Sequence, residues 1–280
     1  MRLSSAFTAM IGAIRSAGGG KSKIPTVSFL ITAYNCERYV AAAVRSALFQ
    51  NFDSLEVLVV DDGSTDATGT ILRGISDDRL RIISQGRVGR QRALNAGIAH
   101  ARGRYIAILD ADDLALPHRA RIQAAFLQAN PDVALVGSRY RTCIDEQGLR
   151  TAESVEPTSY DDIVAKFKAG GNGMFHSSVM FDKARIEAIG GYDTGLSALE
   201  DWDLYVRTAK RFQICNLDIR FALKRIHDAQ FFGGKEGVHS SEKSNLAYRL
   251  ILERTRELKT QSSPSAVMTA AQTHRELSQV

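Results

Sequence analysis

The chain has 280 residues, of which 44% are hydrophobic, and a formal net charge of +5 at pH 7. This composition allows a substantial core in one large domain or two small ones, and it excludes collagen-like, coiled-coil and disordered chains. The modest charge does not by itself indicate a nucleic-acid partner. Three widely spaced cysteines without a CxxC pair argue against a disulfide framework, so a reducing, cytoplasmic location is expected.

The first 23 residues differ in pattern from the rest of the chain. In MRLSSAFTAMIGAIR, apolar residues recur at helical spacing between Arg2 and Arg15, and a glycine-rich stretch occupies 17–20. Two interpretations fit: an interfacial helix that makes peripheral contact with the inner face of a membrane, or a leader without that role. No apolar run in the sequence is long enough to span a bilayer.

Strand and helix patterns alternate through the first half of the chain. The expected elements are strands at 26–34, 55–62, 80–84, 104–110 and 133–140, with helices at 36–49, at 88–101 and after Pro117. This alternation predicts an α/β fold with a Rossmann-like, mainly parallel sheet covered by helices on both faces. Ligands of such sheets bind beyond the carboxyl ends of the strands.

The second half of the chain is less regular. The patterns predict helices at 160–167, 183–189, 200–211 and 240–258, a strand at 176–182, and two strand-like pieces within 212–226. Beyond about residue 260 the composition is polar, as expected of a mobile tail.

Polar and acidic residues come directly after three of the expected strands. They are the Thr-Ala-Tyr-Asn run at 32–35, the acid pair at 61–62 and the Asp-Ala-Asp-Asp run at 110–113. Neighbouring strands lie about 4.8 Å apart, so these clusters are expected to share one pocket. Clustered carboxylates favour Mg²⁺ or Mn²⁺, which completes its shell with phosphate oxygens. Asp113 taken alone fits a solvated turn, whereas Asp110 ends an apolar run.

The order of these motifs resembles one enzyme family. A strand ending in TAYN, then VVDDGSTD, then a glycine-containing helix entry, then GRYIAILDADD is similar to family 2 glycosyltransferases of the bacterial polysaccharide type, over residues 26–227. The resemblance implies a GT-A fold at 24–232, with a nucleotide-sugar half at 24–140 and a smaller acceptor half at 141–232. A leader at 1–23 and a C-terminal helix with a flexible tail at 233–280 flank it.

The resemblance also implies roles for individual residues. Asp110 is expected to face the ribose, and Asp112 is expected to bind the Mn²⁺ or Mg²⁺ that bridges the diphosphate. His227, in LKRIHDAQ, is a second candidate metal ligand. The residues matched to the nucleotide-sugar site are Thr32, Ala33, Tyr34, Asn35, Glu37, Asp61, Asp62, Arg92, Asn95, Asp110, Ala111 and Asp112. Many relatives have proline where this chain has Ala33. Arg87 and Arg90 are interpreted as a solvated basic face.

The acceptor side is indicated by ALEDWDLYVR, which resembles the family's ED motif. Displacement at an anomeric carbon needs a base that takes the proton of the acceptor hydroxyl. The match assigns this role to Asp201, with Glu200 as neighbour and alternative. Without a catalytic role, the two acids would be an ordinary acidic first turn that the helix dipole favours. Trp202 is expected to pack in the core.

The resemblance therefore implies a metal-assisted, inverting hexosyl- or related transferase. It would move a sugar from a nucleotide-diphosphate donor to a hydroxyl of a saccharide or lipid-linked saccharide. One alternative is a non-catalytic GT-A-like protein that binds a nucleotide sugar or a polyanion. Another is an aspartate-nucleophile phosphatase, because LDADDL matches its DxDx motif; that motif, however, belongs on the first strand of its domain. A nicotinamide enzyme lacks its glycine fingerprint here.

Overall fold

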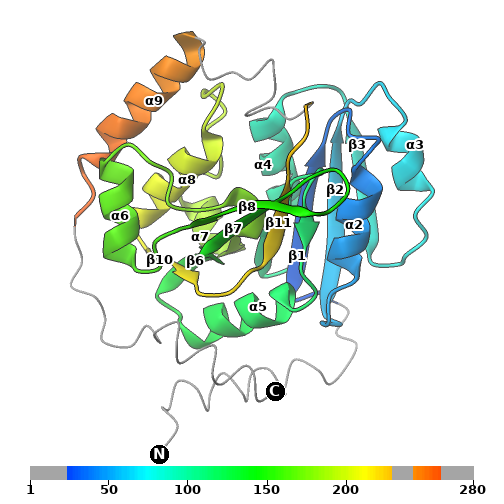
Figure 1. The fold of residues 1–280 in the computed structure, drawn as a ribbon, viewed down its shortest axis with the longest axis horizontal. Coiled ribbons are helices and arrows are strands. Elements are labelled where there is room, and N and C mark those ends of the chain that lie inside the picture. Colours follow the sequence, from blue (N-terminus) through cyan, green and yellow to red (C-terminus); the bar gives the residue numbers. More distant parts are fainter. Residues whose placement is uncertain (1–23, 229–241, 260–280) are drawn as a thin grey trace, which may run out of the picture.

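The computed structural model describes residues 24–228 and 242–259, and its centre is a seven-stranded sheet (Figure 1). The strands, in spatial order, are β10 (Gln213–Leu217), β6 (Val133–Ser138), β9 (Met180–Asp182), β4 (Tyr105–Ile108), β1 (Val27–Ala33), β2 (Leu55–Asp62) and β3 (Leu80–Gln85). All pairs are parallel except those of β9, which runs antiparallel to both β4 and β6. The predicted α/β fold with a mainly parallel sheet is confirmed.

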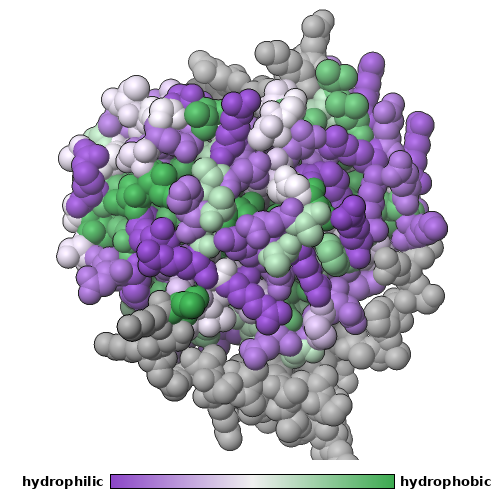
Figure 2. Space-filling model, turned by 180° about the vertical axis from the view of Figure 1, so that it is seen from behind, coloured by the Kyte–Doolittle hydropathy of each residue, from purple (hydrophilic) through white to green (hydrophobic). Residues whose placement is uncertain are grey.

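Helices cover both faces of this sheet (Figure 1). They are α2 (Val40–Leu48), α3 (Thr68–Arg73), α4 (Arg90–His100), α5 (Arg119–Ala129), α6 (Tyr160–Lys168), α7 (Lys183–Ala188), α8 (Glu200–Ala209) and α9 (Glu242–Thr255). The strands alternate between two cores: Phe29 of β1 packs with α2 and α5, whereas Leu30 packs with α4. The rear surface is largely hydrophilic (Figure 2), as expected when helices bury the apolar faces of a sheet.

A second, four-stranded sheet is formed mainly by strands from the second half of the chain. Its order is β5 (Leu114–Ala115), β11 (Ala222–Arg225), β7 (Tyr140–Ile144) and β8 (Arg150–Val155). The sequence did not predict the β7–β8 hairpin, because β8 is mostly exposed on both faces and so lacks an apolar alternation.

Most predicted boundaries lie within two residues of the observed ones, and the largest differences are at two elements. The strand predicted at 176–182 is a 3₁₀ turn, η1 (His176–Ser178), followed by a strand of only three residues, β9. The helix predicted at 36–49 begins at Val40. Helix α9 lies within the predicted 240–258 segment.

The predicted leader at 1–23 and the tail beyond residue 259 lie outside the described residues. In the part of the chain that the structure describes, none of the helices has both the length and the apolar character that a bilayer crossing requires. All three cysteines are free; Cys215 is buried, and Cys36 and Cys143 are half-buried.

Candidate active site

The carboxyl ends of β1, β2 and β4 meet at one edge of the large sheet. Ala33, the last residue of β1, stands opposite Asp61 of β2. On the other side of β1, Leu30 pairs with Ile108, and Asp110 comes two residues later. We refer to Asp61, Asp62, Asp110 and Asp112 as the acidic edge.

Reciprocal hydrogen bonds join the loops that come after β1 and β2. The Asn35 main-chain N–H donates to Ser64 Oγ over 3.1 Å, and the Thr65 N–H donates to Asn35 Oδ1 over 2.9 Å. The Ala67 N–H donates to Glu37 Oε2 over 2.8 Å. Asn35 has a φ of 50°, a left-handed conformation that asparagine tolerates. The side chains of Asn35 and Glu37 therefore fix these two loops against each other.

The two acids at the end of β2 also fasten loops. Asp61 Oδ1 accepts a hydrogen bond from the Ser64 N–H over 3.0 Å. Asp62 accepts from the N–H groups of Val88 and Gly89, over 2.9 and 3.0 Å. Because Gly89 is the N-cap of α4, Asp62 sets the position at which that helix begins.

The remaining residues matched to the nucleotide site differ in exposure. Thr32 and Ala33 are buried, whereas Tyr34 is 38% exposed. The Arg87 guanidinium lies 3.1 Å from the centroid of the Tyr34 ring, so Arg87 stacks on this ring, and its interpretation as part of a solvated face was incomplete. Arg92 is exposed and has no hydrogen bond or ion pair with any residue that the structure describes.

Asn95 connects α4 to the turn before α8. Its Nδ2 donates to the Tyr192 carbonyl, and its Oδ1 accepts from the Tyr192 N–H, both over 2.8 Å. Gly191 must be glycine here, because its φ is 66° and a Cβ would lie 2.5 Å from Asn95 Oδ1. The Asn95 amide is thus engaged with the main chain.

Three carboxylates crowd together after β4. One ligand atom from each of Asp110, Asp112 and Asp113 lies within 4.8 Å of the others. Asp113 is only 2% exposed and accepts hydrogen bonds from Ser177 Oγ and from the Arg225 N–H. Burial, with the added charges of Asp112 and Asp110, raises the pKa of Asp113 well above its usual value. The interpretation of Asp113 as a solvated turn residue is wrong, because it packs against η1 and β11.

Arg90 supplies a positive charge to this corner. Its Nη2 donates to Asp110 Oδ1 over 2.5 Å, and its Nε donates to Glu200 Oε1 over 2.7 Å. Burial alone would raise the pKa of Asp110, but the Arg90 charge and hydrogen bond outweigh it and hold that pKa below the usual range. The interpretation of Arg90 as a solvated cation is also wrong. No pattern near Arg90 indicates this pairing, since Glu200 lies 110 residues away.

His227 reaches the acidic edge from the segment after β11. Its Nε2 lies 3.1 Å from Asp112 Oδ2, and its ring lies 4.4 Å from the Tyr39 ring, centroid to centroid. The Tyr39 hydroxyl donates to Glu146 Oε1 over 2.7 Å, so the β7–β8 turn supports this ring. His227 therefore lies against Asp112, which in turn lies beside Asp110, and carboxylate and imidazole ligands suit Mn²⁺ or Mg²⁺.

The first turn of α8 carries the two acids that the sequence resemblance matches to the family's ED motif, Glu200 and Asp201. Leu199, just before it, has a φ of 60°, an uncommon left-handed conformation for leucine. Asp201 is half-buried; it accepts from Asn172 Nδ2 over 3.0 Å and from the Trp202 N–H over 2.7 Å. Trp202 is 3% exposed, and its ring lies 5.6 Å from that of Tyr248 on α9. Its predicted place in the core is confirmed.

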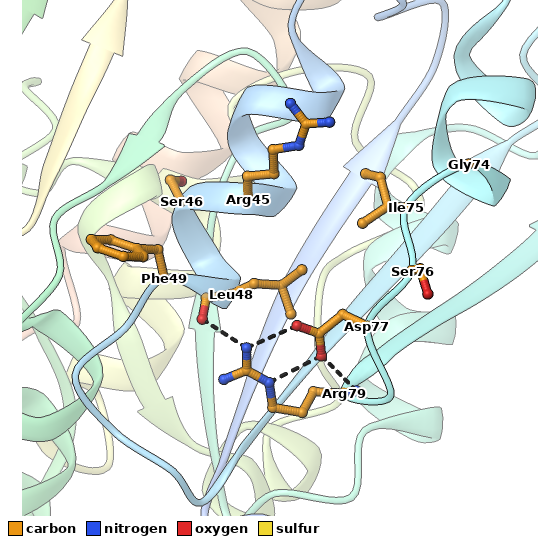
Figure 3. A pocket seen from close by; sticks show the side chains of 9 residues that line it. All are labelled: Arg45, Ser46, Leu48, Phe49, Gly74, Ile75, Ser76, Asp77 and Arg79. Atoms are coloured by element: carbon orange, nitrogen blue, oxygen red, sulfur yellow. Dashed lines mark hydrogen bonds and ion pairs between the residues drawn. The ribbon is translucent and has the colours of Figure 1, made fainter.

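A separate cavity of about 630 Å³ lies at the opposite, amino-terminal edge of the sheet, between the end of α2 and the loop before β3. In Figure 3 Arg79 bonds Asp77 and the Leu48 carbonyl, while the Arg45 and Ser76 side chains point away from each other. The charged side chains that line this cavity either pair with each other, as Arg79 and Asp77 do, or point in different directions. We therefore assign no chemistry to the cavity.

Two solved structures share this architecture. S. aureus TarS 1–349 in complex with UDP-GlcNAc gives a TM-score of 0.64 at 18% identity, over 91% of this chain and 71% of that chain. Mannosyltransferase PcManGT from Pyrobaculum calidifontis, in complex with GDP-Man and Mn²⁺, gives 0.55 at 21% identity, over 92% and 76%. Such identities show the fold alone, which is the GT-A fold of glycosyltransferases.

Sequence comparison identifies the family within the glycosyltransferases of GT-A fold. The family model described as glycosyl transferase family 2 matches residues 28–186. EpsE of Bacillus subtilis (strain 168), named as a glycosyltransferase, is 31% identical over 234 residues, which are 80% of this chain and 81% of that protein. Further relatives, among them a succinoglycan biosynthesis protein and a chondroitin synthase, are matched over less than half of their length. The chain belongs to glycosyltransferase family 2, which disfavours the phosphatase alternative.

Proposed function

We propose that this glycosyltransferase transfers a sugar with inversion, from a nucleotide-diphosphate donor to a hydroxyl of a saccharide or lipid-linked saccharide. The observation that carries the proposal is that one side chain, Arg90, contacts both Asp110 after β4 and Glu200 at the start of α8. The residues expected on the donor side and those expected on the acceptor side therefore meet at one place. The UDP-GlcNAc and GDP-Man bound to the two structural neighbours support a nucleotide-sugar donor.

On the donor side, we assign the nucleotide to the loops after β1 and β2. Their reciprocal hydrogen bonds give a pre-formed wall, and the exposed Tyr34 ring beside Arg87 offers an aromatic surface and a cation. Asp61 and Asp62 border the same edge and are the expected contacts of the base and ribose. Such pre-organisation reduces the ordering cost of binding.

Asp112 and His227 would hold a divalent cation, with Asp110 beside them. When bound, Mn²⁺ or Mg²⁺ would neutralise the diphosphate and stabilise it as a leaving group. The carboxylate and imidazole ligands fit these ions, and the neighbour PcManGT binds Mn²⁺.

Asp201 is the proposed general base. Its carboxylate is half-buried and oriented by Asn172 and by the Trp202 N–H. It accepts the proton of the acceptor hydroxyl as that oxygen bonds to the anomeric carbon. The bond between the anomeric carbon and the diphosphate oxygen breaks in the same step, so the configuration inverts and a nucleoside diphosphate leaves.

The test is an assay of nucleoside diphosphate release from a panel of nucleotide sugars with Mn²⁺, with saccharide and lipid-linked acceptors. Asp201→Asn is expected to lower kcat by about 10²- to 10⁴-fold, and Asp112→Asn to abolish the dependence on Mn²⁺. Asp132→Asn, which changes an exposed acid, is the control. Full activity in Asp201→Asn refutes the base, full Mn²⁺-dependent activity in Asp112→Asn refutes the metal site, and a product of retained configuration refutes inversion.

A further inference from the structure

Arg90 is the only described residue that bonds directly to both Asp110 and Glu200. Its Nε and Nη2, on one edge of the guanidinium, each take one carboxylate. Asp110 comes after β4 in the nucleotide half, and Glu200 opens α8 in the acceptor half. The Arg90 side chain thus links the two halves of the domain through Asp110 and Glu200.

The stem of Arg90 is fixed by its surroundings. Arg90 is the first residue of α4, and its N-cap, Gly89, has a φ of 96° and donates its N–H to Asp62. Farther along the helix, Asn95 bonds the Tyr192 main chain, in the segment that leads to α8. Helix α4, which carries Arg90, is therefore hydrogen-bonded both to the end of β2 and to the segment before α8.

The chemistry of Asp110 and Glu200 explains why position 90 is an arginine. The Glu200 side chain is only 7% exposed, and its one hydrogen-bond partner among the described residues is Arg90. Without that partner, two poorly solvated carboxylates would face each other and separate. A lysine ammonium is a single point charge on a flexible stem, whereas the planar guanidinium fork holds two acceptors at set positions.

We propose that Arg90 is a positioning residue that holds the acceptor-side acids at a fixed distance from the donor-side aspartates. The proposal rests on the function proposed above, in which Asp201 adjoins Glu200 and Asp110 adjoins the donor. Arg90 acts through these acids and not on the acceptor proton itself. Its loss displaces the base relative to the anomeric carbon, and a displacement near 1 Å can cost about 10²-fold in rate.

The variants are Arg90→Gln, Arg90→Lys, Glu200→Gln and the Arg90→Gln/Glu200→Gln double variant. The matched control is Arg104→Gln, which removes an arginine from a 3.2 Å ion pair with Asp182, away from the acidic edge. Arg90→Gln is expected to lower kcat by about 10²-fold while the dissociation constant of the nucleotide sugar changes much less. Arg90→Lys should recover part of the loss, and the double variant should lose less than the sum of the two single losses.

Three results overturn the proposal: kcat in Arg90→Gln equal to that of Arg104→Gln, strictly additive losses in the double variant, or a fall in stability with unchanged turnover per folded molecule. The free energies of unfolding of the same variants, measured in urea, give a double-mutant cycle that needs no substrate. A coupling of zero between Arg90 and Glu200 in that cycle overturns the proposal even where transfer is not detected. A wild-type chain that couples these residues but transfers no sugar from any donor refutes the proposed function instead.

Discussion

Replacing Arg119 with methionine removes a buried cation that has no carboxylate partner within the described residues. Its guanidinium donates to the carbonyls of Ile108, Ser177 and Val179 and to Gln123 Oε1. Burial lowers the pKa of Arg119 to about 9, so the group is still charged at pH 7. Arg119 therefore joins the end of β4, two residues before Asp110, to η1 and to Val179, the residue before β9.

The expected cost can be worked out from these contacts. Two buried carbonyls, those of Ile108 and Ser177, lose their donor, at about 1–3 kcal/mol each, whereas the Val179 carbonyl keeps the hydrogen bond from the Ile108 N–H. Part of this is offset, because the variant no longer buries a charge, and methionine retains most of the apolar stem. We expect a net loss of about 3 kcal/mol in the free energy of unfolding. For a chain of this size that corresponds to a Tm lower by roughly 6–12 °C.

The measurement is urea unfolding at pH 7 of Arg119→Met beside Arg121→Met. Arg121 lies on the same helix and is half-buried, and its Nε has no hydrogen-bond partner, so its replacement is expected to change stability by less than about 0.5 kcal/mol. If Arg119→Met unfolds within about 1 kcal/mol of the Arg121 variant, the Ile108 and Ser177 carbonyls do not depend on this guanidinium and the reasoning fails.

Two further predictions concern the stability of the fold away from the acidic edge. Burial opposes ionisation of Glu56, but hydrogen bonds from the Arg102 N–H, Ser28 Oγ and Arg81 lower its pKa overall. Because the folded pKa is below the unfolded one, Glu56→Gln should cost about 2 kcal/mol at pH 7, and this difference should shrink as pH falls below about 4; a gap independent of pH contradicts it. Gly97→Ala would place Cβ 2.2 Å from Leu30 Cδ1 and should cost about 1–3 kcal/mol, whereas Gly86→Ala, where a Cβ meets nothing within 4 Å, should not.

Much of the fold and the location of the acidic edge could be predicted from short-range pattern. The runs that form β1, β2 and β4 are apolar over most of their length, and parallel strands necessarily bring their carboxyl ends to one edge. Asp110 and Asp112 therefore lie where the sequence predicts them. The β7–β8 hairpin was not predicted, because its exposed strand carries no such pattern.

The environments of single charged residues could not be predicted in the same way. Arg90 and Asp113 look like solvated residues in their own segments, a helix entry and a turn. Their partners are Glu200, 110 positions from Arg90, and Ser177, 64 positions from Asp113. Whether a charge is paired or solvated depends on these distant elements, and composition near the residue carries no information about them.

Two segments of the candidate site contain residues in a strained, left-handed backbone conformation. Among the described residues, the non-glycine residues with positive φ are Asn35, in the loop after β1, and Leu199, immediately before the ED motif. A left-handed conformation costs a leucine roughly 1–2 kcal/mol, so surrounding contacts must enforce it. Asn35 is held by hydrogen bonds with Ser64 and Thr65, and Leu199 packs against the core on the α8 side of the sheet. In the function proposed above, these two positions are the donor loop and the entry to the acceptor-side acids, and each conformation sets the direction of the residues that come after it.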